Sequence, residues 1–258
     1  VAPDPTMQRL VTDPVQAFVA EQQTTIIAET EVELDGRNPD PIRLHESNLG
    51  NLVADAWLWQ ATQLAPSFGV GTPDVALQNG GGIRNNSVLG PGPITLFDTF
   101  QVAPFANFVS VVESVSPAEF KALMENSVAA LPDANGRFGH IAGFEMVYDP
   151  SGTPQTYNQD NTIATPGERI VNITLDDGTP IIACGAVAPG APNVNMATID
   201  FTARGGDQYP FESGFTTLGV GYQEALENYL VDGLGGVGTA SEYPAGGEGR
   251  ISAGAACP

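Results

Sequence analysis

A run of three glycines directly after a short apolar segment is the feature that most constrains this chain. Gly80-Gly81-Gly82 follows Val75–Leu77 and leads into Ile83-Arg84. Glycine has no Cβ, so its backbone can turn tightly and approach a ligand closely. A guanidinium at the end of such a turn suits a phosphate or another planar anion. A tight surface loop with an exposed arginine is the alternative interpretation of the same residues.

The charge balance of the chain makes its arginines conspicuous. Acidic residues outnumber basic ones by 30 to 9, which gives the 258-residue chain a net charge of −21 with Lys121 as the only lysine. This balance argues against nucleic acid as a partner, because binding a polyanion needs a basic patch. We expect so acidic a surface in an exported or salt-exposed protein. No uninterrupted apolar run of about 18 residues occurs, so the sequence predicts no membrane span.

The chain has two cysteines, Cys184 and Cys257. Two cysteines make neither a disulfide framework nor a zinc site. If the protein is exported, one bridge between them could hold the C-terminal tail. Two unpaired small residues are the alternative.

Hydrophobic periodicity predicts a mixture of helices and strands without regular alternation. The expected helices cover residues 8–30, 46–64, 116–131 and 221–230, with Ser47 or Asn48 and Ser116 as caps. The expected strands cover residues 30–34, 74–78, 108–114, 144–148, 169–175, 180–183 and 194–203. The pattern favours the α+β class: a single domain with a mixed β-sheet flanked by helices, preceded by an N-terminal linker helix.

The residues that carry most hydrolytic chemistry are scarce. The only histidines are His45 and His140, and there is no His-Glu-x-x-His or Gly-x-Ser-x-Gly motif. A pair of metal ions usually draws on several His and Asp ligands, which this chain cannot easily supply. We therefore expect no metal site and no catalytic residue in this chain.

Two arginines and two phenylalanines are candidates for binding. Arg43 precedes the helix expected at 46–64, whose N-terminus offers free N–H groups and a positive dipole end, so Arg43 and Arg84 are two possible phosphate clamps. Phe105 and Phe201 could sandwich a flat base, and Asp207 could accept hydrogen bonds from a ribose diol. The alternatives are a surface ion pair for Arg43, core positions for the rings, and a turn-stabilising aspartate.

Taken in order, several strings resemble the C-terminal domain of the 5′-nucleotidase / UDP-sugar hydrolase / 2′,3′-cyclic phosphodiesterase family. They are Arg43 with Glu46–Ala56, Asn79–Arg84, Ile94-Thr95 with Pro104–Asn107, Gly143–Asp149, Asp200–Tyr209 and Glu248–Ile251. No single string is decisive, but their order over residues 30–252 covers nearly the whole chain.

The resemblance implies substrate-binding residues and no catalytic residue. They are Arg43 and Arg84 for the phosphate; Asn79, Gly81 and Gly82 around the base; Phe105 and Phe201 on its two faces; Asn107 on its edge; and Asp207 on the ribose. Gly136, in the loop 134–137, is a further match. Gln208 stands where the family usually has glycine, and its Cβ could alter the turn that carries Asp207.

The same resemblance implies how the protein is organised. Residues 31–258 would form the nucleotide-binding domain, and residues 1–30 a linker helix and arm. In the family, this domain rotates to move substrate between open and closed states. A separate N-terminal metallophosphatase domain of the full-length chain would carry two divalent metal ions, so this chain would need no cofactor and would bind a nucleotide or nucleoside without turning it over. We expect an exported protein, in the periplasm, on the cell surface or secreted.

Two other functions remain open. The chain could be a non-catalytic extracellular binding or scaffold module that keeps the fold, in which turns such as Asp176-Asp177-Gly178 could hold Ca²⁺. It could also be a self-contained hydrolase that uses paired carboxylates, although no pair stands out.

Overall fold

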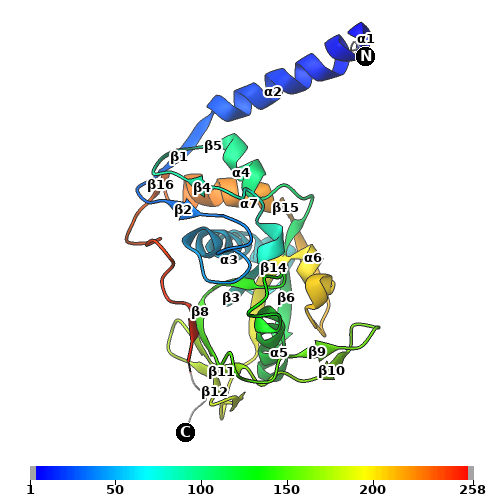
Figure 1. The fold of residues 1–258 in the computed structure, drawn as a ribbon, viewed down its shortest axis with the longest axis vertical. Helices are drawn as coiled ribbons and strands as arrows, with labels where there is room; N and C mark the ends of the chain where they lie inside the picture. The colour runs from blue at the N-terminus through cyan, green and yellow to red at the C-terminus, as the bar shows by residue number, and fades with distance from the viewer. Residues whose placement is uncertain (1–3, 255–258) are drawn as a thin grey trace.

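A helical arm projects from the body of the molecule (Figure 1). The computed structural model describes residues 4–254. Its arm consists of α1 (Pro5–Met7), η1 (Gln8–Thr12) and α2 (Asp13–Thr24). The carboxylate of Asp4 caps its tip by accepting from the backbone N–H groups of Thr6 and Met7.

The helix expected over residues 8–30 is too long. It ends at Thr24, and β1 (Ile26–Thr30) pairs antiparallel with β5 (Gly92–Thr95) and parallel with β16 (Val237–Gly238). The expected strand 30–34 is therefore also wrong, because the strand lies earlier and β2 (Leu34–Asp35) pairs separately with β4 (Val88–Leu89). The β-branched residues Thr25, Ile26 and Ile27, directly after this helix, favour the extended backbone.

Two five-stranded sheets form the body. The central sheet has the order β15 (Phe215–Gly221), β6 (Phe108–Val115), β14 (Val194–Ile199), β3 (Val75–Asn79) and β7 (Gly139–Ala142). The second has the order β13 (Ala186–Val187), β12 (Pro180–Ala183), β11 (Ile170–Leu175), β8 (Phe144–Tyr148) and β17 (Ile251–Ala253). Because β14 runs parallel to β3 and antiparallel to β6, the central sheet is mixed, as predicted.

Helix α3 (Asn48–Phe68) packs against β3 and β7 and forms the larger hydrophobic core. The Ser47 hydroxyl accepts from the Gly50 N–H at 3.0 Å, which confirms the predicted cap. The helix ends at Gly69, whose φ of 71° is left-handed. Helix α5 (Pro117–Val128) begins at the predicted cap Ser116 and packs against β7 and β11 within the second core.

Short elements complete the part of the chain that the structure describes. They are η2 (Gly80–Gly82), α4 (Leu96–Val102), β9 (Thr156–Tyr157), β10 (Ile163–Thr165), α6 (Asp200–Ala203), η3 (Gly206–Gln208), α7 (Tyr222–Asn228) and η4 (Tyr229–Gly233). The strand expected at 194–203 stops at Ile199, because Asp200–Ala203 turns into α6. The helix expected at 116–131 ends as a helix at Val128. With these corrections, the predicted α+β class is confirmed.

Of the two cysteines in the predicted bridge, one lies within the described residues. Cys184 follows β12 and is disulfide-bonded. Cys257 lies outside the described residues.

Candidate functional site

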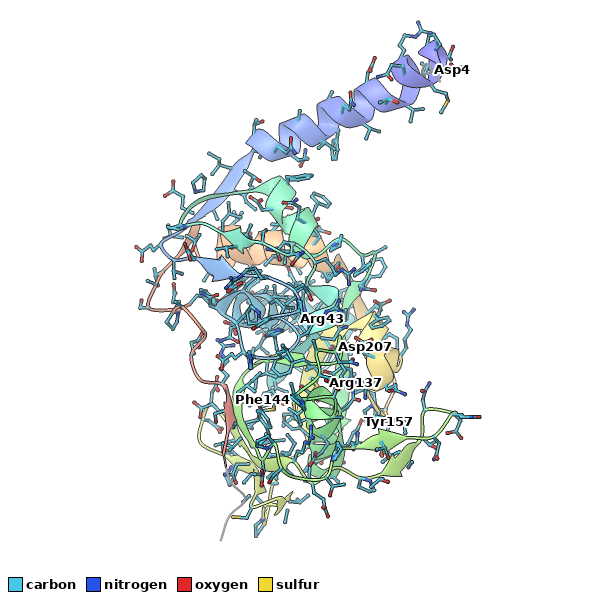
Figure 2. The ribbon with its side chains drawn as sticks, viewed as in Figure 1. Asp4, Arg43, Arg137, Phe144, Tyr157 and Asp207 are labelled. Atoms are coloured by element: carbon cyan, nitrogen blue, oxygen red, sulfur yellow. The ribbon has the colours of Figure 1, made fainter. Side chains whose placement is uncertain are left out.

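A cavity of about 390 Å³ brings together all the residues that the sequence predicts as substrate-binding. Its lining consists of Arg43, Asn79, Gly81, Gly82, Arg84, Phe105, Asn107, Gly136, Ile199, Phe201 and Asp207. Arg43 and Asp207 lie near the middle of the body (Figure 2). Ile199 is the one lining residue that the sequence analysis missed; as the last residue of β14, two before Phe201, it could have been inferred from the strand end.

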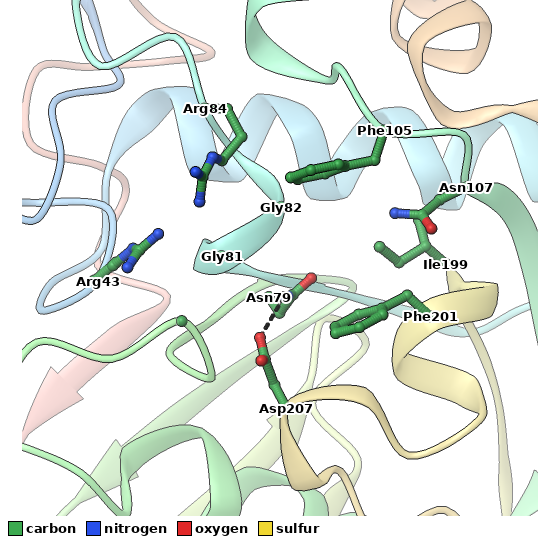
Figure 3. Close-up of a pocket in the computed structure, with 11 residues that line it drawn as sticks. Arg43, Asn79, Gly81, Gly82, Arg84, Phe105, Asn107, Ile199, Phe201 and Asp207 are labelled. Carbon is green, nitrogen blue, oxygen red and sulfur yellow. Dashed lines mark hydrogen bonds between the residues drawn. The ribbon is translucent and has the colours of Figure 1, made fainter.

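The two phenylalanine rings lie on opposite sides of this cavity (Figure 3). Phe105 is 47% exposed and Phe201 is 39% exposed, so neither is a core residue. Phe201 lies on α6, and Phe105 lies in the loop after α4, where its backbone N–H donates to the Tyr222 hydroxyl at 2.7 Å. Burial raises the pKa of Tyr222, so this hydroxyl stays protonated.

Arg43 and Arg84 lie on the same side of the glycine turn (Figure 3). Neither joins any of the ion pairs found within residues 4–254, so the surface ion pair considered for Arg43 is not made. The Nε of Arg43 is buried and has no hydrogen-bond partner among the described residues. The Cζ of Arg84 lies 5.6 Å from the centroid of the Phe105 ring. Both guanidinium groups are therefore free to bind an anion.

A second hollow continues from the arginines. It measures about 380 Å³ and is lined by Asn38, Pro39 and Asn86 together with Arg43 and Arg84. The arginine end of the site is therefore open and polar rather than closed.

Close backbone packing, as well as the shape of the cavity, requires glycine at this turn. Gly80 N–H donates to Phe138 O at 2.6 Å, and Gly81 N–H donates to Gly136 O at 2.8 Å. A Cβ on Gly80 would lie 2.2 Å from Ile42 O, the carbonyl of the residue before Arg43. The turn thus lies in close backbone contact with Ile42, next to Arg43, and with Gly136 and Phe138.

Asp207 lies at the cavity despite the departure at position 208. Asp207 and Gln208 have φ values of 50° and 62°, in the left-handed region that non-glycine residues rarely adopt. The Gln208 side chain accepts from Arg137 and donates to Asn161 Oδ1 at 3.1 Å. The Asp207 carboxylate accepts from Asn79 Nδ2 at 2.6 Å. Gln208 therefore does not displace Asp207 from the site.

The described part of the chain holds neither a metal-ligand cluster nor a membrane span. Among residues 4–254, no three or more His, Cys, Asp or Glu side chains are arranged to hold a metal ion. Side chains arranged to hold a pair of metal ions are thus not found among these residues. No helix in that range has both the length and the apolar character needed to cross a bilayer.

A family model and several known proteins are similar to this chain. The family model described as the 5′-nucleotidase C-terminal domain matches residues 26–213. The chain belongs to this family. The match spans the arginines, the glycine turn, both phenylalanines and Asp207 of this 5′-nucleotidase C-terminal domain.

Several individual proteins similar to this domain are nucleotidases or nucleotide phosphoesterases. The domain is 30% identical over 190 residues to the snake venom 5′-nucleotidase of Crotalus adamanteus, covering 73% of this chain and 30% of that protein. It is 29% identical over 180 residues to the trifunctional nucleotide phosphoesterase protein YfkN of Bacillus subtilis, covering 70% and 11%. The crystal structure of the 5′-nucleotidase precursor from Thermus thermophilus superposes with a TM-score of 0.72 at 27% identity, covering 98% of this chain and 44% of that one. The chain thus spans less than half the length of each of these proteins.

Proposed function

We propose that this domain binds a nucleotide, stacking the base between Phe105 and Phe201 and holding the phosphate with Arg43 and Arg84. The observation that carries the proposal is the convergence on one cavity of about 390 Å³ of two exposed rings and two guanidinium groups that join no ion pair within residues 4–254. This volume lies in the usual range for small-molecule sites. In a chain of net charge −21, free arginines at a cavity favour an anionic ligand.

The remaining lining residues suit the other parts of a nucleotide. The Asn107 side chain can both donate to and accept from a base edge. The Asp207 carboxylate can accept from ribose hydroxyls. Asn79, Gly81 and Gly82 border the space between base and sugar, where backbone without side chains permits close approach.

We propose that phosphate-ester cleavage takes place on a metallophosphatase domain of the same full-length protein. The described residues offer no cluster that fits a metal pair, so no step through metal ions is assigned to them. Two divalent ions on that other domain would supply the activated water. The role of this domain is then to bind and orient the substrate.

We also propose that the protein is exported. Disulfides persist in oxidising compartments, and Cys184 is disulfide-bonded. The strong acidity of the chain agrees with this placement.

Titration calorimetry with AMP, adenosine and inorganic phosphate tests the binding proposal. We expect AMP to bind more tightly than adenosine, because the arginines contact only the phosphate. Phe105→Ala and Phe201→Ala should each weaken both ligands by about tenfold or more, as stacking on an aromatic ring contributes about 1–3 kcal/mol. Phe100→Ala is the matched control, since Phe100 is 40% exposed on α4 but does not line the cavity.

The outcomes separate the candidate functions. A folded domain that binds no nucleoside, or that binds equally well without either ring, would contradict the proposal and favour a scaffold module. Release of phosphate from AMP by this chain alone, with added Mn²⁺ or Zn²⁺, would contradict the placement of catalysis on another domain.

A further inference from the structure

A buried chain of hydrogen bonds runs from helix α3 to the edge of the cavity. Trp57 Nε1 donates to Gln78 Oε1 at 2.7 Å. Gln78 Nε2 donates to Asn79 Oδ1 at 2.8 Å, and Asn79 Nδ2 donates to Asp207 Oδ2 at 2.6 Å. Trp57 and Gln78 are 0% exposed and Asn79 is 2% exposed, so water does not compete for the first two bonds. The third bond ends on Asp207, which is half-buried at the cavity.

The direction of this chain follows from the chemistry of its ends. A side-chain amide can turn over and exchange its oxygen and nitrogen, but an indole N–H can only donate. Gln78 must therefore present its oxygen to Trp57 and its NH₂ to Asn79. Asn79 must then accept with its oxygen, which leaves its NH₂ for Asp207. An ionised carboxylate only accepts, so both ends require the same direction.

The glycine turn leaves room for these amides. A Cβ on Gly82 would lie 2.1 Å from Gln78 Nε2. A Cβ on Gly81 would lie 3.1 Å from both Asn79 Nδ2 and Asp207 Oδ2. Gln78 Nε2 also donates to the main-chain oxygen of Asn79 at 2.7 Å, which ties it to the end of β3. The hydrogen-bonded chain and the three glycines thus form one packed unit.

Trp57 also supports the opposite side of the cavity. Its ring lies 5.8 Å from that of Tyr222, centroid to centroid. The Tyr222 hydroxyl accepts from the backbone N–H of Phe105. The buried Trp57 indole therefore contacts Tyr222, which holds the backbone of Phe105. Through Gln78, the same indole orients the Asn79 amide beside Asp207.

We propose that Trp57 and Gln78 are positioning residues for sugar recognition, which hold Asn79 with its NH₂ toward Asp207. This proposal rests on the proposed nucleotide binding. The bond from Asn79 holds Oδ2 of the carboxylate and leaves Oδ1 to accept from a ribose hydroxyl. The opposite amide orientation would set the Asn79 oxygen against the carboxylate. The hydrogen-bonded chain therefore favours ligands with ribose hydroxyls over those without them.

Gln78→Glu tests the direction of the hydrogen-bonded chain, because glutamate has nearly the same shape as glutamine. The ionised glutamate still accepts from Trp57 but cannot donate to Asn79, whereas the protonated glutamate can do both. Burial raises the pKa of such a carboxyl. We expect the preference for AMP over 2′,3′-dideoxy-AMP to be near wild type at pH 5 and about tenfold lower at pH 9, since a hydrogen bond to a charged group is lost. The wild-type preference should change little between these pH values.

A second variant and a control separate positioning from folding. Trp57→Phe keeps a ring against Tyr222 and removes the indole N–H, and should reduce the same preference about fivefold. Gln60→Glu is the matched control, because Gln60 is a buried glutamine of α3 that accepts from Asn228 and does not line the cavity. Its ligand preference should equal that of the wild type at both pH values.

Neutron diffraction of the ligand-free protein tests the same proposal without ligand. Deuterons on the Asn79 atom that faces Asp207 support it, and deuterons on the atom that faces Gln78 overturn it. Unchanged ligand preference in folded Gln78→Glu and Trp57→Phe would also overturn it. If the wild type binds no AMP, the proposed function fails, whereas the neutron result still decides the direction of the chain.

Discussion

The cavity and the C-terminal strand β17 use arginine in opposite ways. Beside β17, Arg250 pairs with Asp55 at 2.7 Å and with Glu248 at 2.9 Å, and it donates to Ile141 O. At the cavity, Arg43 and Arg84 join none of the ion pairs of residues 4–254. In a chain with 30 acidic residues, a guanidinium without a carboxylate is a consequence of where the fold places it. Arginine near β17 links segments, whereas the role that we propose for arginine at the cavity is to bind a ligand.

Glu46, an acidic residue near β17, also uses its carboxylate for contacts within the fold. The Glu46 carboxylate accepts from Asn51 and from the backbone N–H groups of Gly249 and Ile251. This ties the end of the chain to the start of α3. Truncating a residue there should change stability, whereas truncating one at the cavity should change binding.

Arg250→Met should give the largest effect. Its side chain is only 14% exposed, and its loss leaves the partly buried Asp55 without its ion-pair partner. We expect the free energy of unfolding to fall by about 3 kcal/mol in urea titrations, while the folded variant still binds AMP. Arg37→Met is the control: Arg37 pairs with Asp35 but its side chain is 62% exposed, so this variant should lose much less stability than Arg250→Met. Equal losses in the two variants would contradict the distinction.

A change of pH should give a smaller loss of stability through His140, on β7. Burial lowers the pKa of His140 to about 4, and its Nε2 hydrogen-bonds Ile42 O, next to Arg43. The unfolded chain binds a proton near pH 6.5, so it takes up more protons than the folded state between these values. The stability from His140 is therefore present above pH 6.5 and lost as the pH falls toward 4. We expect about 2 kcal/mol less stability at pH 4.5 than at pH 6.5 from this group.

Variants of the two histidines isolate this contribution. His140→Gln should remove most of that pH dependence in urea titrations at the two pH values. His45→Gln is the control, because His45 is exposed and its 4.0 Å contact with Asp40 is exposed on both sides. If both variants keep the wild-type slope, His140 is not the group responsible.

Arg84→Met should give the smallest change in the free energy of unfolding. It should also separate ligand binding most clearly from stability. Arg84 has no ion-pair partner within residues 4–254, so the free energy of unfolding should change by less than about 0.5 kcal/mol. AMP affinity should fall about tenfold by calorimetry, while adenosine affinity stays the same. Arg9→Met makes the same charge change on the arm and should leave both affinities unchanged. A common loss for AMP and adenosine would show that Arg84 acts through Phe105 rather than on the phosphate.

Local signals in the sequence predicted much of the fold. Ser47 and Ser116 cap helices as expected, because their hydroxyls bond the free N–H groups of the next turn. Errors occurred where an apolar pattern crossed a change of structure, at residues 25–30 and 200–203. Helical and extended periods cannot be told apart in such short runs.

The sequence predicted residues that line the candidate site, but it did not predict the buried residues that hold them in place. The arginines, the phenylalanines and Asp207 were identified from motifs and meet at one cavity. Trp57 and Gln78 carried no such signal, because a buried tryptophan on a helix and a glutamine at the end of a strand look like ordinary core and edge residues. Their roles follow only from the contact between α3 and β3.

The sequence by itself determined the turns, the caps, the acidity and the set of side chains able to bind an anion and a flat base, since these depend on neighbouring residues and composition. Tertiary structure alone decided which arginines found carboxylates and which did not. It also decided which way the amide of Asn79 faces. Both depend on distances between segments far apart in the chain, such as residues 79 and 207, and electrostatic and hydrogen-bond energies are determined by those distances.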